Sequence, residues 1–322
     1  MRHCRSLLLS RTRLAVLAAA TLLLPVPAVR SEEPAKTASA APTAAAKPAS
    51  YPEEIAAWHQ ERIAGLKRPD GWLSLVGLFW LKEGENRFGS SPANTVIFPE
   101  GSTPAVAGTL ERHGKAVRVH AAPGVALTHK GKPVTDLDLK PEAGPPTELA
   151  LGSLRFFIIY RGDRVGVRVK DTQSPALAAF KDVDTFPVQT AWRVDARFEP
   201  YNPPKKIAIA NILGQVEDQD SPGAVVFERD GRTYRLEALD GGPDGSLFFV
   251  FGDQTNGHET YGAGRFLDTT APKDGRVVVD FNQAYNPPCA FTSFATCPLP
   301  PKPNKLAVKV EAGEKKYGEG HP

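Results

Sequence analysis

Residues 154–169, LRFFIIYRGDRVGVRV, decide the fold, because two runs rich in β-branched and aromatic residues flank a turn that contains Gly and Asp. Short runs of this kind, bounded by turn residues, are typical of β-strands. The same pattern of short apolar runs separated by turn residues continues in both directions along the chain. Further runs are GWLSLVGLFWL (71–81), NTVIF (94–98), AVRVH (116–120), AWRVDARF (191–198), KKIAIANIL (205–213), AVVFER (224–229), TYRLEAL (233–239), SLFFVFG (246–252), GRFL (264–267), RVVVDF (276–281) and LAVKVEA (306–312). The long helical connections that parallel strands require do not separate these runs, so the sequence predicts a mainly β, antiparallel architecture.

The composition excludes two other classes of protein. Of the 322 residues, 41% are hydrophobic, which supplies a sizeable core and excludes a wholly disordered chain. The 30 prolines and 28 glycines exclude a chain built mainly of long helices.

The first 28 residues have the layout of a secretory signal peptide. Arg2, Arg5, Arg11 and Arg13 precede the apolar run 14–24, and small residues follow up to Ala28. We therefore expect residues 1–28 to be removed and the protein to be exported, to the periplasm or beyond. The apolar run is shorter than the roughly 20 residues that span a bilayer, so no stable membrane span is expected after cleavage.

Export also changes the charge of the chain. Removing these four arginines from the 39 basic residues leaves one fewer basic than the 36 acidic residues. A nearly neutral protein has no net field to attract nucleic acid, so no nucleic-acid partner is expected.

The mature chain divides into a linker and two lobes. Residues 29–50 are rich in Ala, Pro, Ser and Thr and predict a disordered linker. Residues 51–170 predict a helix over 53–66 followed by a β-sandwich lobe. Residues 171–322 predict a second β lobe, a sheet or barrel, that carries a Pro-rich C-terminal loop and two cysteines.

Part of the first lobe resembles the forkhead-associated β-sandwich. The likeness spans residues 84–170 and lies in FGSSPANTVIFP (88–99), HKGKPVTDLDL (129–139) and LALGSLRFFIIY (149–160). Phosphothreonine recognition in that family needs an Arg where this chain has Ser90, and the Ser-x-x-His signature is replaced by GTLERH (108–113). The resemblance implies a β-sandwich that lacks the bidentate phosphate contact.

A second resemblance covers nearly all of the mature chain, from about Tyr51 to Tyr317. The segments GWLSLVGLFWLKEGENRFGS (71–90), FPVQTAWRVDARFEPY (186–201), TYGAGRFL (260–267), VVVDFNQAYNPPCAFTSFATCPLPPKPNKL (277–306) and AGEKKY (312–317) are similar to the bacterial family DUF1684. This family brings no established activity, so the resemblance assigns no site residue.

The segment from Asp280 to Asn304, called the proline-rich segment below, is the first candidate for function. It holds six prolines among polar, aromatic and cysteine side chains. A long connection of this kind is unusual in a compact domain unless it is functional or disordered, and its aromatic residues argue against disorder. We expect a rigid lid or rim; the alternative is a structural plug over an open sheet edge.

Arg265 marks the second candidate. It follows two glycines and precedes Phe266 and Leu267 on a predicted strand, where a guanidinium needs a carboxylate or a ligand anion. A structural ion pair with Asp253, Asp280 or Glu311 is the alternative to a ligand contact. The predicted ligand-binding residues, all near strand ends or in the proline-rich segment, are Asp253, Thr255, Tyr261, Arg265, Asp280, Asn282, Tyr285 and Asn304.

Cys289 and Cys297 are the only cysteines left after removal of Cys4 with the signal peptide. In an oxidising compartment they predict one disulfide. A metal site and a reactive thiol are the alternatives, but neither paired metal-ligand spacing nor an adjacent base supports them. We expect no metal and no cofactor.

These residues favour an exported protein that binds a small polar or anionic ligand. One alternative is a hydrolase or lyase that uses Asp253, His258 or Glu259 as acid and base. Another is an envelope protein-interaction module, although the sequence identifies no protein partner. Signatures of serine hydrolases, zinc proteases and phosphate-binding loops do not occur in the chain.

Overall fold

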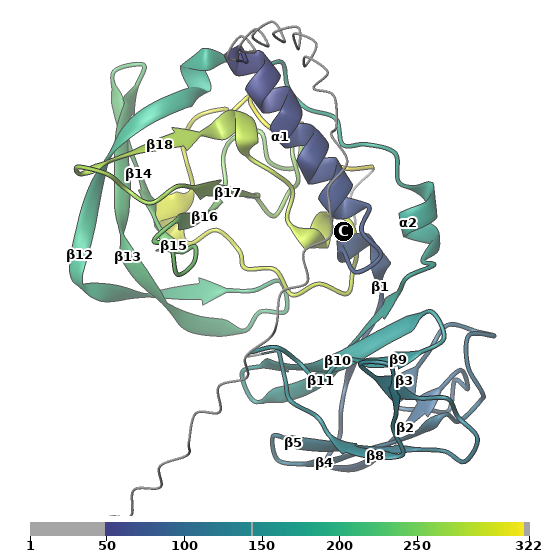
Figure 1. Cartoon of the computed structure of the whole chain (residues 1–322). Helices are drawn as coiled ribbons and strands as arrows, with labels where there is room; N and C mark the ends of the chain where they lie inside the picture. The colour runs from purple at the N-terminus through teal and green to yellow at the C-terminus, as the bar shows by residue number, and fades with distance from the viewer. Residues whose placement is uncertain (1–48, 143, 319–322) are drawn as a thin grey trace, which may run out of the picture. The chain divides into compact units, whose positions relative to one another are not determined.

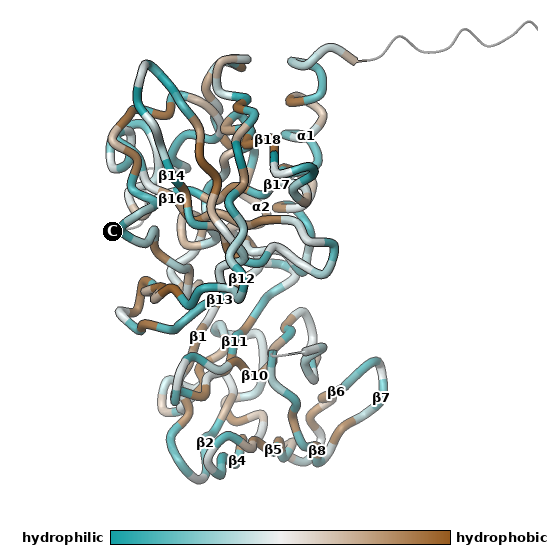
Figure 2. The backbone as a smooth tube through the Cα atoms, turned by 90° about the vertical axis from the view of Figure 1, so that its left-hand side faces the viewer, coloured by the Kyte–Doolittle hydropathy of each residue, from teal (hydrophilic) through white to brown (hydrophobic). Residues whose placement is uncertain are grey.

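The computed structural model describes residues 49–142 and 144–318. The predicted signal peptide and the linker up to residue 48 lie outside the described residues. The mainly β prediction is confirmed: antiparallel sheets dominate both lobes, and a helix lies near the N-terminus (Figure 1). Hydrophobic stretches, brown in Figure 2, run through the strands of both lobes. No helix among the described residues is long and apolar enough to cross a bilayer.

The N-terminal lobe is the predicted β-sandwich. One sheet has the order β1 (Leu75–Trp80), β11 (Arg164–Asp171), β10 (Leu154–Arg161), β9 (Leu149–Leu151), β6 (Thr128–His129) and β7 (Lys132–Pro133). The other has the order β3 (Val96–Ile97), β2 (Gly84–Gly89), β4 (Gly108–His113), β5 (Ala116–Ala121) and β8 (Asp136–Asp138). The opening stretch forms the β10–β11 hairpin, in register from Leu154↔Asp171 to Arg161↔Arg164.

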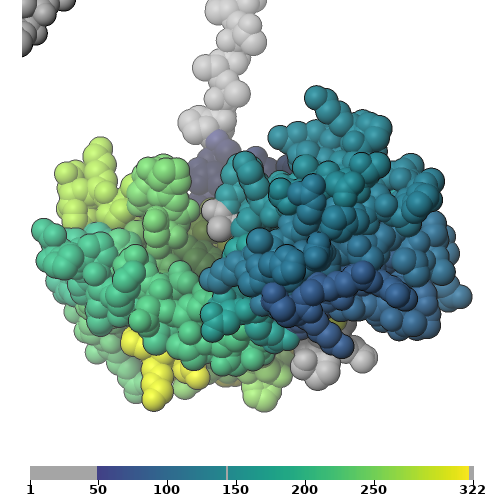
Figure 3. Space-filling model, turned by 90° about the horizontal axis from the view of Figure 1, so that it is seen from below, coloured from purple at the N-terminus to yellow at the C-terminus, as the bar shows by residue number. Residues whose placement is uncertain are grey.

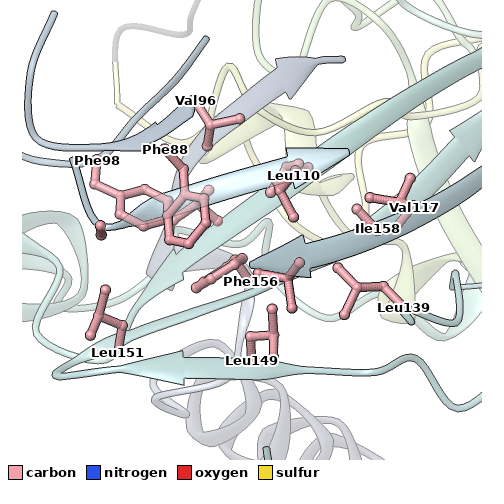
Figure 4. Packing of buried hydrophobic residues seen from close by; sticks show 14 of the residues in the cluster. Phe88, Val96, Phe98, Leu110, Val117, Leu139, Leu149, Leu151, Phe156 and Ile158 are labelled. Carbon is pink, nitrogen blue, oxygen red and sulfur yellow. The ribbon is translucent and has the colours of Figure 1, made fainter. Parts of the chain in front are cut away.

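The core of the sandwich is centred on three phenylalanines from different strands and loops. Phe88, Phe98 and Phe156 pack with ring centroids 5.1–5.7 Å apart, and each is at most 1% exposed (Figure 4). Alternation along β4 and β5 turns the apolar side chains inward, as a sheet with one wet face requires. Strand β10 differs, because it is buried on both faces from Phe156 to Ile159.

The C-terminal lobe is built from open sheets, and no closed barrel forms among the described residues. One sheet has the order β14 (Arg232–Glu237), β13 (Val216–Arg229), β12 (Arg193–Ala210) and β18 (Arg276–Asp280), and the other has the order β15 (Leu239–Asp240), β16 (Leu247–Phe251) and β17 (Arg265–Thr269). Phe227 and Leu236 of the first sheet share a buried cluster with Phe249 and Leu267 of the second. The chain between the lobes carries the short helix α2 (Pro175–Ala179) and the 3-10 turn η2 (Thr190–Trp192).

After Asp280, the last residue of β18, the proline-rich segment contains no strand. It forms three 3-10 turns, η3 (Phe281–Gln283), η4 (Pro288–Ala290) and η5 (Lys302–Asn304). The run 306–312 that follows was predicted as a strand, but it joins no sheet. Its carbonyl groups at Val310 and Ala312 accept hydrogen bonds from the Arg265 guanidinium, which leaves them unavailable to a neighbouring strand.

Helix α1 (Tyr51–Leu66) matches the predicted helix and begins two residues earlier. Its first turn is stabilised by a hydrogen bond from the Ser50 backbone N–H to the Glu53 carboxylate, 2.6 Å. Although α1 precedes the sandwich in the chain, its long-range contacts lie in the C-terminal lobe (Figure 1). The Tyr51 hydroxyl donates to Asp280 at 2.8 Å, and Arg62 pairs with Glu314 at 3.0 Å.

Hydrogen bonds join the end of β10 and the turn after it to the proline-rich segment and to β13. Arg161 Nε donates to Thr296 Oγ1 at 2.7 Å, and the Gly162 N–H donates to the Glu217 carboxylate at 2.9 Å. In the space-filling view of Figure 3 the N-terminal lobe, in blue, meets the C-terminal lobe, in green.

We predict that Phe156→Ala destabilises the sandwich strongly. The substitution removes a fully buried ring and leaves a cavity, which costs about 3–5 kcal/mol. Urea unfolding measures the loss. Ile97→Ala, at a position 38% exposed in the same lobe, is the control and should cost less than about 1.5 kcal/mol. Equal losses for the two variants would contradict the core assignment.

Candidate functional site

A cavity of about 600 Å³ lies between the loop that follows β16 and the end of the proline-rich segment. We call it the flap pocket. Its lining comes from the end of β12, the loop 252–264 and the stretch 299–306, and comprises Ala210, Gly252, Asp253, Gln254, Asn256, Gly262, Ala263, Gly264, Leu299, Pro300, Lys305 and Leu306. The pocket lies beside the glycine pair and the proline-rich segment, and of the eight predicted ligand-binding residues only Asp253 is part of its lining.

Backbone hydrogen bonds fix the walls of the flap pocket. The Gly252 N–H donates to Asn304 O at 3.0 Å, and the Leu306 N–H donates back to Gly252 O at 2.7 Å. On the other side, the Leu299 N–H donates to Ala210 O at 2.7 Å, which attaches the proline-rich segment to the end of β12. These bonds make the pocket a preformed feature of the fold.

The Asn304 side chain reinforces this wall from inside. Its Oδ1 accepts from the Glu237 N–H at 2.7 Å, while its Nδ2 donates to Glu237 O at 2.9 Å and Val250 O at 3.0 Å. Asn304 is 1% exposed, so its amide holds strands β14 and β16 to the proline-rich segment and is not directed to solvent.

Gly264 allows the two walls to approach each other. Its φ is +93°, and an added Cβ would lie 2.5 Å from Phe251 O and 2.6 Å from Pro300 Cγ. Any larger residue here would push the proline-rich segment away from β16.

Behind the pocket lies a fully buried ion pair. Arg265 Nη2 and Asp253 Oδ2 are 2.9 Å apart, and both side chains are 0% exposed. Arg265 also donates to Val310 O at 2.8 Å, and Asp253 Oδ1 accepts from the Thr255 hydroxyl at 2.6 Å. Burial lowers the pKa of Arg265, and Asp253 opposes that shift. This arrangement is the structural pair that the sequence offered as the alternative to a ligand contact.

The other predicted residues lie in separate clusters. The Asp280 carboxylate accepts hydrogen bonds from the Tyr51 hydroxyl and the Asn282 side chain. Burial is the larger cause, and the Asp280 carboxylate the second, of a raised pKa at Tyr51. The Tyr285 hydroxyl donates to a different carboxylate, Asp268 Oδ2, at 2.7 Å. The structure thus brings Asp253, Thr255 and Arg265 together, but it does not bring them together with Asp280, Asn282 or Tyr285.

The residues of the enzymatic alternative do not converge either. The Asp253 carboxylate is occupied by Arg265 and Thr255. His258 is exposed in the turn, and Glu259 is 3.6 Å from Lys309 Nζ.

Cys289 and Cys297 are free thiols, both buried, and lie next to each other. The backbone N–H of each points to the other's Sγ, at 3.2 and 3.3 Å. The Tyr261 hydroxyl donates to Cys289 O at 3.2 Å. The predicted disulfide is not formed in this structure and stays a prediction. Within residues 49–142 and 144–318, no three His, Cys, Asp or Glu side chains are grouped so that they could hold a metal ion.

Sequence reasoning missed the cation at the flap pocket. Lys305 lines the pocket and is exposed. Ion pairs of lysines in the described chain involve Lys205, Lys206 and Lys309, which leaves Lys305 without one. The only signal in the sequence was its place next to Asn304.

Comparisons with known proteins name no activity. Residues 178–315 match the model of a family described as "Protein of unknown function (DUF1684)". This region holds most of the C-terminal lobe and the proline-rich segment, so the match supports the sequence resemblance over residues 178–315. No curated protein matches the chain. It is similar to the solution NMR structure of an uncharacterized protein of Haloarcula marismortui, with 28% identity over 43% of this chain and 78% of that chain and a TM-score of 0.37.

We predict that Asp253→Asn destabilises the C-terminal lobe by about 3–5 kcal/mol, because it leaves the Arg265 charge buried without a carboxylate. Urea unfolding at neutral pH measures the effect. Asp195→Asn is the control, since the Asp195–Arg276 pair is exposed and should contribute at most about 1 kcal/mol. A small effect at Asp253 would contradict the structural role of the buried pair.

Tyr261 predicts a dependence of stability on alkaline pH. Burial raises its pKa to about 12, above the value of about 10 in the unfolded chain. The unfolded state then releases its proton first, so the contribution of Tyr261 is present below about pH 10 and is lost as the pH rises to about 12. The difference in urea midpoint between the wild type and Tyr261→Phe should be constant from about pH 7 to 9. Above about pH 10 the wild type should lose stability relative to the variant. A constant difference throughout would contradict the assignment.

Proposed function

We propose that the protein, after export from the cytoplasm, binds a small anionic molecule with an apolar body in the flap pocket. Support for export comes from the sequence of residues 1–28, which lie outside the described residues. Support for binding comes from the size, the walls and the charge of the pocket.

The volume and the walls suit a small organic molecule. The pocket measures about 600 Å³, within the roughly 300–1,000 Å³ of ligand sites. Ala263, Leu299 and Leu306 supply apolar surface. Because backbone hydrogen bonds already hold the walls, a ligand has little ordering entropy to overcome.

The charge of the ligand follows from Lys305. The buried Arg265 guanidinium already donates hydrogen bonds to Asp253 and to main-chain carbonyl groups, so it cannot reach a ligand. Lys305 is exposed at the pocket and has no ion-pair partner among residues 49–142 and 144–318, and an ammonium in that setting favours a carboxylate or another small anion. An unpaired lysine beside a preformed, largely apolar pocket is the observation that carries the proposal.

The test compares hexanoate and phenylacetate with their uncharged amides, by calorimetry and thermal shift. We expect the carboxylates to bind and the amides to bind more weakly. Lys305→Ala should reduce carboxylate affinity about fivefold, the value of an exposed ion pair of about 1 kcal/mol, and should leave amide affinity unchanged. Ala263→Phe should block both, because its ring would occupy the pocket.

Lys302→Ala is the matched control. Lys302 is an exposed lysine three residues away that does not line the pocket. Binding of neither carboxylate would contradict the proposal, as would an equal loss of affinity in the Lys302 and Lys305 variants.

A further inference from the structure

The thiols of the proline-rich segment lie at the point where it is attached to the rest of the molecule. The Tyr261 hydroxyl donates to Cys289 O at 3.2 Å, and the Ile212 N–H donates to Cys297 O at 3.0 Å. The adjacent Thr296 hydroxyl accepts from Arg161 of the N-terminal lobe at 2.7 Å. The loop 252–264, the β12–β13 hairpin and the N-terminal lobe are therefore all held within one residue of a cysteine.

We propose that Cys289 and Cys297 are a site of oxidative modification, and that the disulfide they form locks the proline-rich segment onto both lobes. The reciprocal contacts of 3.2 and 3.3 Å between each backbone N–H and the other Sγ place the sulfur atoms side by side. The proposal does not depend on a ligand in the flap pocket.

The reaction is an exchange with an external disulfide. One cysteine thiolate attacks a sulfur of that disulfide, which forms a mixed disulfide and releases the first external thiol. The second thiolate then attacks the protein sulfur of the mixed disulfide and releases the second external thiol. The two cysteines lose two protons and two electrons, and the external disulfide gains them as two thiols.

The surroundings favour Cys289 as the first attacker. A hydrogen bond from the Cys297 thiol lowers the pKa of Cys289, and the buried guanidinium of Arg168 acts in the same direction. Arg168 is 2% exposed and pairs with Glu142 at 2.8 Å, so its charge is fixed in place.

The bond would act on two cavities at once. Thr296 and Pro298 line a cavity of about 500 Å³ that also includes Arg161 of the N-terminal lobe. Leu299 and Pro300 line the flap pocket. A crosslink that fixes Cys297 therefore restrains a wall of each.

The test uses the full chain, unfolded in urea and refolded with either a glutathione redox buffer or dithiothreitol. Unfolding gives the reagent access to the buried thiols. Alkylation under denaturing conditions and peptide mapping then separate Cys289 and Cys297 from Cys4, the third cysteine. We expect the two mapped cysteines to be joined after oxidation, and the oxidised protein to melt about 5 °C or more above the reduced one.

The double variant Cys289→Ser, Cys297→Ser is the control and should melt at one temperature in both buffers. Alkylation of both cysteines after oxidation would overturn the proposal, as would capture of glutathione at each cysteine without a mutual bond. A disulfide without a melting shift would overturn the locking role. Failure of carboxylates to bind changes none of these readouts, so the two proposals fail separately.

Discussion

The buried pair of Asp253 and Arg265 is the interaction on which the C-terminal lobe depends. Removing two charges from water is costly, and hydrogen bonds to both groups offset that cost. Here the guanidinium donates to the carboxylate and to main-chain carbonyls near the C-terminus, while the carboxylate accepts from Thr255 and from the Val310 N–H. The pair thereby fixes the end of β16, the start of β17 and the run 306–312 relative to one another.

The flap pocket is a consequence of this arrangement. The carbonyl groups at 310 and 312 hydrogen-bond to Arg265, and the run 306–312 joins no sheet. The proline-rich segment that precedes this run packs against Gly252 and Gly264. At position 264 only glycine leaves room for Pro300. The Asp253–Arg265 pair, which no ligand can reach, thus helps to form the wall of the flap pocket, which a ligand can enter.

The strands could be predicted from the sequence because their signal is local. Alternation in β4 and in the start of β12 follows from side-chain direction alone, whatever lies opposite. The partners of polar side chains are not local, and the sequence could not distinguish an Arg265 that meets Asp253 from one that meets a ligand. For the same reason the sequence could not connect Ala210 with Leu299, or α1 with Glu314.

Placement of α1 has a consequence for how the molecule is completed. The Tyr51–Asp280 contact closes a separation of 229 residues and the Arg62–Asn286 contact one of 224, with the whole sandwich lying between. Arg62 also reaches Glu314, 252 residues away. Such distant contacts are slow to form because chain entropy opposes the closure of long loops. A chain emerging from its N-terminus can thus build the sandwich early, but helix α1 must wait for its partners at 280–314 to arrive.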